Sequence, residues 1–237
     1  MGLLKTFFNN TGRPAGFLGR VMLWSMNWGH APVADWGMGF ISGLSPQHIA
    51  DIGCGGGRNA AELLRRFPGS SLTAVDYSEE SIEKTRKVNR EAVSAGRCET
   101  LVADVSSLPL PSDHFDLVTA FETVYFWPDP AENFRGVRRI LRPGGTFLIV
   151  NEADGTIPRD ARWTDIIDGL KIYNGDQLIG FLREAGFTTC RAERDQKKHR
   201  LCVIAEKDGI PGYSLRRSPD RRMSFRFSCW RPGLSAE

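Results

Sequence analysis

Three aspartates stand at the ends of three apolar segments in the first half of the sequence. Asp51 follows "HIA" and precedes a glycine-rich turn, Asp76 ends "SLTAVD", and Asp104 ends "ETLVAD". Apolar segments that alternate with helical ones are typical of parallel strands, and ligands bind such sheets beyond the carboxyl ends of the strands. We therefore expect the three carboxylates to lie in a row at the rim of one ligand-binding crevice.

The turn after Asp51 contains four glycines within five positions, in the sequence "GCGGG" at residues 53–57. Glycine adopts positive φ readily and lets the main chain approach a ligand without an intervening Cβ. The turn therefore predicts a nucleotide-like cofactor. One register, from Gly55 to Ala60, fits the dinucleotide pattern G-x-G-x-x-A, so the glycines alone leave an NAD-binding oxidoreductase open.

The acidic residues favour S-adenosylmethionine over a dinucleotide. Near a pyrophosphate, the charge of Asp51 would be repulsive, by about 1 kcal/mol or more once partly desolvated. Near an ammonium or sulfonium group it would be attractive, and S-adenosylmethionine carries both of these groups and no phosphate. Asp76 can accept hydrogen bonds from two vicinal ribose hydroxyls, a feature that NAD shares. Asp104 can accept from the exocyclic amine of adenine.

Strand-like and helical patterns alternate from residue 48 to residue 207. The predicted strands cover residues 48–53, 71–77, 99–104, 115–121, 146–152, 188–195 and 200–207. The predicted helices cover 58–67, 78–96, 131–141 and a stretch around 175–187. This alternation is typical of a parallel sheet with helices on both faces, and the two final segments predict a hairpin with one antiparallel strand.

The two ends of the chain differ from this central part. Residues 1–46 contain short helical segments and are interpreted as a cap or lid, residues 47–207 as the cofactor-binding domain, and residues 208–237 as a basic, poorly ordered tail. Unless they are ordinary helix core, four side chains of the cap are expected to form an apolar pocket mouth: Trp24, Met26, Trp28 and Trp36. Tyr125, Phe126 and Trp127 are expected to face this mouth.

The net charge of +3 is unevenly distributed. From Lys207 onward there are seven basic and three acidic residues, whereas the other 206 residues contain 24 basic and 25 acidic ones. The main domain is therefore nearly neutral, which disfavours a nucleic-acid substrate. The sequence contains neither an apolar run long enough to cross a membrane nor a signal-peptide pattern, so we expect no membrane partner.

The cysteines and histidines show no metal-binding or disulfide pattern. The five cysteines are scattered and never spaced as Cys-x-x-Cys, which favours a reducing cytoplasm. The four histidines, His30, His48, His114 and His199, are isolated in the sequence. We therefore expect a cytoplasmic protein without a metal ion.

Four motifs, in this order, resemble the class I S-adenosylmethionine-dependent methyltransferases. They are "DIGCGGG", "VDYSEESI", "VADVSSLPLPSDHFDLVTAFETVYFWPD" and "RILRPGGTFLI", and the resemblance covers roughly residues 47–206. It implies a three-layer αβα Rossmann-like fold with an N-terminal helical cap. It also implies a seven-stranded sheet in the order 3-2-1-4-5-7-6, with strand 7 antiparallel.

The resemblance further implies which residues bind S-adenosylmethionine. Asp51 and the glycines would line its methionine part, and Asp76 would bind the ribose. Tyr77 would flank the adenine, and Asp104 with the backbone of Val105 would read the adenine edge. The expected cofactor-binding residues are Asp51, Gly53, Gly55, Gly57, Asp76, Tyr77, Asp104, Val105 and Phe121.

The expected acceptor is a small molecule. Base-methylating enzymes of the same superfamily usually carry an Asn-Pro-Pro-Tyr-like tetrapeptide after strand four, where this sequence has "FETVYFWPDP". Methyl transfer is an in-line displacement, and it needs a general base only if the acceptor loses a proton. Candidates for that catalytic role are His30, Glu122 and Glu152. A module that binds the cofactor without turnover stays open as an alternative.

Overall fold

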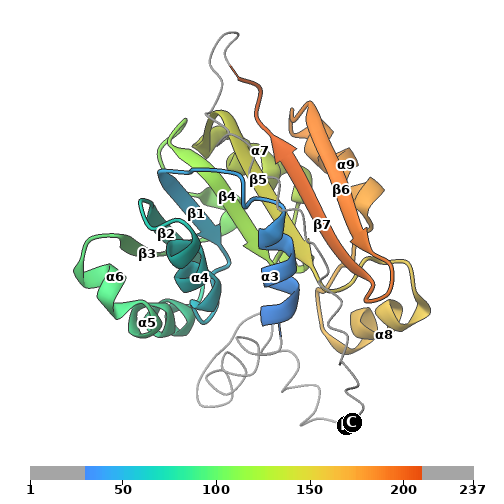
Figure 1. Cartoon of the computed structure of the whole chain (residues 1–237). Helices are drawn as coiled ribbons and strands as arrows, with labels where there is room; N and C mark the ends of the chain where they lie inside the picture. The colour runs from blue at the N-terminus through green and yellow to red at the C-terminus, as the bar shows by residue number, and fades with distance from the viewer. Residues whose placement is uncertain (1–29, 210–237) are drawn as a thin grey trace, which may run out of the picture.

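A single seven-stranded sheet forms the centre of the computed structural model, which describes residues 30–209 (Figure 1). The strands are β1 (His48–Ile52), β2 (Ser71–Asp76), β3 (Cys98–Val102), β4 (Phe115–Phe121), β5 (Leu141–Asn151), β6 (Thr189–Asp195) and β7 (Arg200–Glu206). Their order is β3-β2-β1-β4-β5-β7-β6, and β7 runs antiparallel to β5 and to β6. The predicted sheet order and the antiparallel last strand are confirmed.

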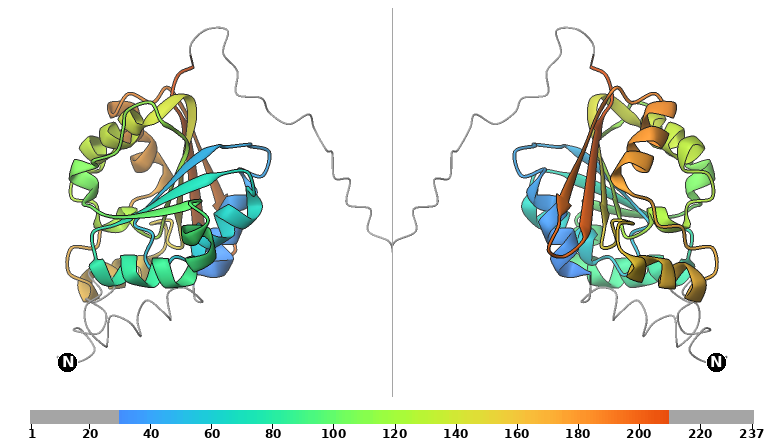
Figure 2. Two further views of the ribbon diagram at one scale, coloured as in Figure 1. Left: turned by 90° about the vertical axis from the view of Figure 1, so that its left-hand side faces the viewer. Right: turned by 90° about the vertical axis from the view of Figure 1, so that its right-hand side faces the viewer.

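Helices cover both faces of this sheet, as Figure 2 shows. They are α3 (Ala31–Gly39), α4 (Arg58–Arg66), α5 (Glu79–Val88), α6 (Arg90–Ser94), α7 (Pro130–Ile140), α8 (Pro158–Ile166) and α9 (Gly175–Glu184), with short 3-10 helices η1 (Val105–Ser107) and η2 (Val124–Phe126). Side chains of α7 and α9 share one buried cluster with the sheet, whereas those of α3, α4 and α5 share another. The predicted three-layer αβα architecture is confirmed.

Local sequence signals explain where several helices begin and end. The hydroxyl of Ser78 accepts a hydrogen bond from the backbone N–H of Ser81 and so caps α5, as predicted. At α9, Asn174 and Gln177 form a reciprocal capping box. These caps satisfy N–H groups that have no partner within the helix and thereby fix the helix starts.

Two helices differ from those predicted. The helix predicted at 78–96 is divided at Asn89, which ends α5 and begins α6. The side chain of Asn89 donates a hydrogen bond to the carbonyl oxygen of Gly57 in the glycine turn. Helix α8 has no counterpart among the predicted helices, since its sequence "PRDARWTDI" lacks a repeated apolar spacing. The apolar patterns in the sequence therefore predict the strands and helices of the main layers better than the segments that connect them.

Helix α3 packs directly against β5 and belongs to the helical layer on that face. A Cβ at Gly37 would lie 2.3 Å from a methyl group of Val150, so the two elements approach each other closely. Trp36 packs edge-on against Phe40, and the guanidinium of Arg200 lies over its ring. The part of the predicted cap that the structure describes thus packs on the sheet.

The rest of the predicted cap and nearly all of the tail fall outside the described residues. Trp24, Met26 and Trp28 lie there, as does the chain from residue 210 onward. The predicted domain boundaries at 46/47 and 207/208 stay predictions. Among residues 30–209, no helix is both long and apolar enough to cross a membrane.

The contact between α3 and β5 predicts a difference between two neighbouring glycines. Gly37→Ala should lower the free energy of unfolding by about 1–3 kcal/mol, because the added methyl group overlaps Val150. Gly39→Ala is the matched control, since a Cβ at that position meets no atom within 4 Å. Urea denaturation measures both, and equal stability of the two variants would contradict this packing.

Candidate functional site

The glycine turn between β1 and α4 leaves no room for side chains at two positions. Gly53, Gly55 and Gly57 all have positive φ, at +76°, +52° and +79°. A Cβ on Gly53 would lie 2.2 Å from Oγ1 of Thr123, and one on Gly57 would lie 2.7 Å from Cα of Thr85. The turn therefore needs glycine for its conformation and for its packing, and its bare main chain can approach a ligand.

Two side chains of α5 and its end hold this turn in place. The amide Nδ2 of Asn89 donates to the carbonyl oxygens of Gly57, at 2.9 Å, and of Thr85, at 3.0 Å. The hydroxyl of Thr85 donates to the carbonyl oxygen of Gly55 at 3.0 Å. The interruption of the helix at Asn89 thus supports the glycine turn, because a buried carbonyl needs a donor.

The three predicted aspartates follow one another along one edge of the sheet. Asp51 lies in β1, Asp76 ends β2, and Asp104 follows β3, and these strands are neighbours that run parallel. In Figure 1 the arrow of β1 points toward the lower rim of the sheet. The three strand ends that carry these aspartates thus lie side by side, and their role as the rim of one ligand-binding crevice stays a prediction.

Asp76 connects the glycine turn to the start of α5. Its Oδ2 accepts from the backbone N–H of Gly55 at 2.9 Å, and its Oδ1 accepts from the backbone N–H of Ser78 at 3.0 Å. Burial raises the pKa of this carboxyl group, while the backbone N–H groups of Ser78 and Gly55 oppose that rise. The backbone N–H of Tyr77 and the hydroxyl of Ser81 act on this carboxylate in the same direction, so several donors hold it in place, and ribose hydroxyls would share its oxygens with them.

Asp51 is more deeply buried, with 1% of its surface exposed. Its Oδ1 accepts from the hydroxyl of Thr119 at 2.8 Å, but its Oδ2 is buried and has no hydrogen-bond partner among the described residues. Burial raises the pKa of Asp51 to about 7; the Thr119 bond opposes this rise and the charge of Asp76 adds to it. An unpartnered oxygen of this kind is unfavourable by itself and would be satisfied by a donor or a cation.

The outer end of the row is more open to solvent. Asp104 is exposed and accepts from the backbone N–H of Ser106 at 2.8 Å, which caps η1 at Val105. Tyr77 directly follows β2 and is 41% exposed. An exposed ring and an exposed carboxylate on neighbouring strand ends suit the face and the edge of a purine. Phe121 is buried at the end of β4.

The three candidate catalytic residues lie together at the ends of α3, β4 and β5. One potential ligand atom from each of His30, Glu122 and Glu152 lies within 4.8 Å of the other two. Nε2 of His30 is 3.6 Å from Oε2 of Glu152. His30 precedes α3 as its N-terminal boundary residue, and burial lowers the pKa of its imidazole while the charge of Glu152 opposes that change. The histidines are isolated in the sequence but not in the fold, since His30 meets two acids and His48 stacks on His114 with ring centroids 4.5 Å apart.

Glu122 is held in an unusual conformation. Its φ of +59° lies in the left-handed region, which residues other than glycine adopt rarely. Its N–H donates to the carbonyl oxygen of Val150 at 2.9 Å, and its Oε1 accepts from the backbone N–H of Glu152. Burial of the carboxyl group, and then the charge of Glu152, raise the pKa of Glu122 well above its ordinary value. Strain of this kind is concentrated at functional sites.

Sequence reasoning missed several supporting residues. Thr119, Thr85 and Asn89 hold the carboxylate and the turn, yet each reads as an ordinary strand or helix residue in the sequence. The one signal in the sequence that could have pointed to these contacts is Asn89, an asparagine near the middle of the helix predicted at 78–96. Tyr125, by contrast, is among the residues that the sequence predicts near the pocket mouth. It is buried, and its hydroxyl accepts from the backbone N–H of Ala153 at 3.0 Å and donates to the carboxylate of Glu122.

Trp127 does not face the site as expected. It is 4% exposed and stacks with Phe147 at a ring-centroid distance of 6.3 Å, within the cluster shared with α7. Its Nε1 donates to Oγ1 of Thr123 at 3.4 Å. Trp127 is therefore a core residue. It lies between η2 and α7, where its ring packs against the apolar side chains of this buried cluster.

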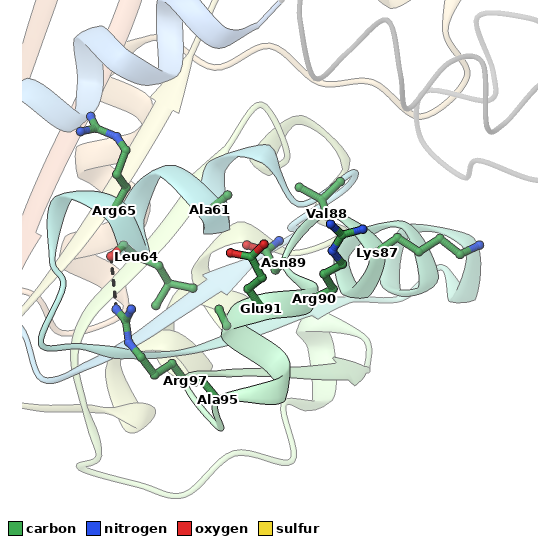
Figure 3. A pocket seen from close by; sticks show the side chains of 11 residues that line it. Ala61, Leu64, Arg65, Lys87, Val88, Asn89, Arg90, Glu91, Ala95 and Arg97 are labelled. Carbon is green, nitrogen blue, oxygen red and sulfur yellow. Dashed lines mark hydrogen bonds between the residues drawn. The ribbon is translucent and has the colours of Figure 1, made fainter.

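A separate hollow of about 490 Å³ lies between α4, α5 and α6 (Figure 3). Its basic lining residues are Arg65, Lys87, Arg90 and Arg97. Arg97 donates to the carbonyl oxygen of Leu64, as the dashed line in Figure 3 marks. None of the predicted site residues lines this hollow, although Asn89 is shared between it and the support of the glycine turn.

Residues 50–149 match a family model described as a methyltransferase domain. An O-methyltransferase of Pyrenophora dematioidea is 30% identical over 170 residues, which cover 69% of this chain and 63% of that protein. The chain therefore spans somewhat less than two thirds of the length of this curated relative.

Two solved structures share the fold. An O-methyltransferase family protein from Burkholderia thailandensis has a TM-score of 0.72 and 16% identity, with 85% of this chain and 64% of that chain covered. The S-adenosylmethionine-dependent methyltransferase SibL, in its apo form, has a TM-score of 0.66 and 21% identity, with 86% and 65% covered. By contrast, the order 3-2-1-4-5-6 of dinucleotide-binding sheets lacks the antiparallel β7 found here.

The burial of Asp51 predicts a pH-dependent gain of stability on its neutralisation. Its carboxyl group has a higher pKa in the folded chain than in the unfolded chain, so ionisation destabilises the fold as pH rises toward and past 7. The stability advantage of Asp51→Asn over the unmodified chain should therefore grow by roughly 2–3 kcal/mol between pH 5 and pH 8.

Chemical denaturation at several pH values measures this advantage. Asp104→Asn removes a charge from the same edge of the sheet at an exposed position, and it controls for loss of charge alone. A constant difference between Asp51→Asn and the unmodified chain from pH 5 to pH 8 would show that Asp51 is not the destabilising buried acid described here.

Proposed function

The chain belongs to the class I S-adenosylmethionine-dependent methyltransferases, and from this premise we propose that it transfers a methyl group from S-adenosylmethionine to a small-molecule acceptor. The observation that carries the proposal is the buried, unpartnered Oδ2 of Asp51 at the rim of the sheet. An α-ammonium group supplies both the hydrogen bond and the positive charge that this oxygen lacks.

The other residues of the row fit the remaining parts of the cofactor. The glycine turn would give the amino-acid part access to main-chain groups, and Asp76, whose carboxylate is oriented by the backbone N–H groups of Gly55 and Ser78, would accept from the ribose hydroxyls. Tyr77 and Asp104, with the backbone of Val105, stand where a purine would be recognised by stacking and by hydrogen bonds at its edge. Phe121 ends β4 between this region and the cluster that contains Glu122.

The bound cofactor would supply an electrophilic methyl group on a sulfonium, which leaves as a neutral thioether when an acceptor lone pair forms the new bond. The chain itself would hold the two reactants in line and limit access of water. His30, Glu122 and Glu152 would stand at the acceptor end of the site. There they would bind the acceptor and receive its proton, if the acceptor loses one in the step.

The nature of the acceptor follows from charge and from the relatives. The main domain carries almost no net charge, which disfavours a nucleic acid as the acceptor. The O-methyltransferase that this chain resembles supports an acceptor oxygen. Cys54, Cys98, Cys190 and Cys202 are free, which supports a reducing, cytoplasmic location.

The direct test is methyl transfer to a metabolite. The full chain would be incubated with methyl-labelled S-adenosylmethionine and a small-molecule extract, and labelled products would be identified by mass spectrometry. A product heavier by one labelled methyl group is expected. Binding of S-adenosylhomocysteine without any labelled product would favour a non-catalytic binding module, and binding of NAD instead would contradict the proposal.

Asp76 offers a test of the ribose contact. Asp76→Asn keeps the size of the side chain but replaces one acceptor by a donor, so it cannot serve both backbone N–H groups and both ribose hydroxyls. Its affinity for S-adenosylhomocysteine should fall by roughly 10- to 150-fold, which corresponds to about 1.5–3 kcal/mol. Calorimetry measures this, with Glu99→Gln, an exposed acid elsewhere on β3, as the control. Equal affinities would remove the ribose role.

Asp51 predicts how cofactor affinity depends on pH. The ammonium group should bind the ionised carboxylate, whose pKa in the free protein is about 7. Affinity for S-adenosylhomocysteine should therefore rise about tenfold from pH 6 to pH 8. Methylthioadenosine has the same nucleoside but no ammonium group, so its affinity should stay nearly constant. Parallel pH profiles of the two ligands would contradict the contact with Asp51.

A further inference from the structure

His30, Glu122 and Glu152 form a cluster with an excess of negative charge. Two carboxylates and one imidazole present their nitrogen and oxygen atoms within 4.8 Å of one another. Among the side chains that the structure describes, neither glutamate has a lysine or arginine partner, and the one ion pair of the cluster joins His30 to Glu152 at 3.6 Å. Two acids held side by side without a cation repel each other, so a bound cation would stabilise this arrangement.

The three side chains differ in how firmly they are held. Glu122 is fixed by the bond of its N–H to Val150 and by the bond that its side chain accepts from Glu152 N–H. The side chains of His30 and Glu152 are 32% and 61% exposed and can adjust. Around an ion with ligand bonds of about 2.1 Å, ligand atoms lie roughly 3–4.2 Å apart. The observed 3.6 Å falls within that range, and small side-chain movements suffice for the third atom.

We propose that His30, Glu122 and Glu152 bind a divalent metal ion, and that this ion holds an oxygen atom of the methyl acceptor. One imidazole and two carboxylates suit Mn²⁺, Fe²⁺, Co²⁺ or Zn²⁺ better than Ca²⁺ or Mg²⁺, which prefer ligand sets made of oxygen alone. This inference departs from the expectation of no metal, which rested on the separation of the histidines in the sequence. The fold removes that separation by bringing α3 against β5.

The position of the cluster gives the ion a role in selecting the acceptor. Three protein ligands leave coordination positions open for water or substrate. Such an ion would favour an acceptor with a hydroxyl group, because it would lower the pKa of that hydroxyl. With the three side chains engaged as ligands, the proton would pass to solvent instead of to one of them, before the new carbon–oxygen bond forms and the carbon–sulfur bond breaks. This second part of the inference rests on the proposed methyltransferase function, whereas metal binding itself does not.

Binding of Mn²⁺ alone to the full chain tests the site without reference to activity. The protein would first be freed of metal with a chelator and then titrated with Mn²⁺, with the electron paramagnetic resonance signal of the unbound ion as the readout. We expect one ion per chain at micromolar concentrations. His30→Gln and Glu152→Gln should each weaken binding at least about 10-fold. Both positions are partly exposed, so neither variant should fail to fold.

His199→Gln is the matched control, because His199 also lies near a carboxylate, with Nδ1 4.0 Å from Oδ2 of Asp154, but belongs to no cluster of three such groups within the described residues. Its Mn²⁺ affinity should equal that of the unmodified chain. Binding no tighter than millimolar in the unmodified chain, or equal binding in all four proteins, would overturn the metal site.

Measurements with the cofactor separate this inference from the proposed function. S-adenosylhomocysteine should bind the metal-free protein and both cluster variants with unchanged affinity, since Asp51 and Asp76 are intact. Full methyl transfer in the presence of chelator would overturn the role of the metal and leave the methyltransferase proposal standing. Failure of the metal-free protein to bind S-adenosylhomocysteine would overturn the methyltransferase proposal, whatever the result with Mn²⁺.

Discussion

Asp51 lies in a strand between β2 and β4, where burial opposes its negative charge and one of its two oxygens has no hydrogen-bond donor. A fold selected for stability alone would favour an apolar or fully bonded residue at this position. The carboxylate is held by Thr119, beside the charge of Asp76, which makes its ionisation still less favourable. Its retention is explained if a positively charged group of a ligand completes its surroundings, and the site follows from this requirement.

The elements around Asp51 hold the glycine turn in place. Gly53 and Gly57 leave no room for a Cβ, and Asp76, Thr85 and Asn89 bind N–H and carbonyl groups of that turn. At the other end of the site, Glu122 and Glu152 are held by a different backbone arrangement. There the left-handed backbone of Glu122 directs its carboxyl group to the N–H of Glu152. Both ends therefore present acidic groups, which suits a cationic donor at one end and a cation-bound acceptor at the other.

The sequence predicted the parts of this structure that depend on repeating patterns. The alternation of strands and helices, the glycine turn and the acids at strand ends are local, and the family motifs fix the order of the strands. The meeting of His30 with Glu152 could not be predicted, because it depends on how closely α3 packs on β5 through Gly37 and Val150. Nor could the break at Asn89, whose side chain satisfies a carbonyl distant in sequence.

The ionisation of Asp51 is the most direct measure of this account. Carbon-13 NMR of aspartate-labelled protein, with Asp51→Asn to assign the signal, would follow its carboxyl carbon as a function of pH. We predict a midpoint near pH 7 in the free protein, as burial requires, and a midpoint lower by at least about one unit with S-adenosylhomocysteine bound. A midpoint near 4 in the free protein, or one that the ligand leaves unchanged, would contradict the account.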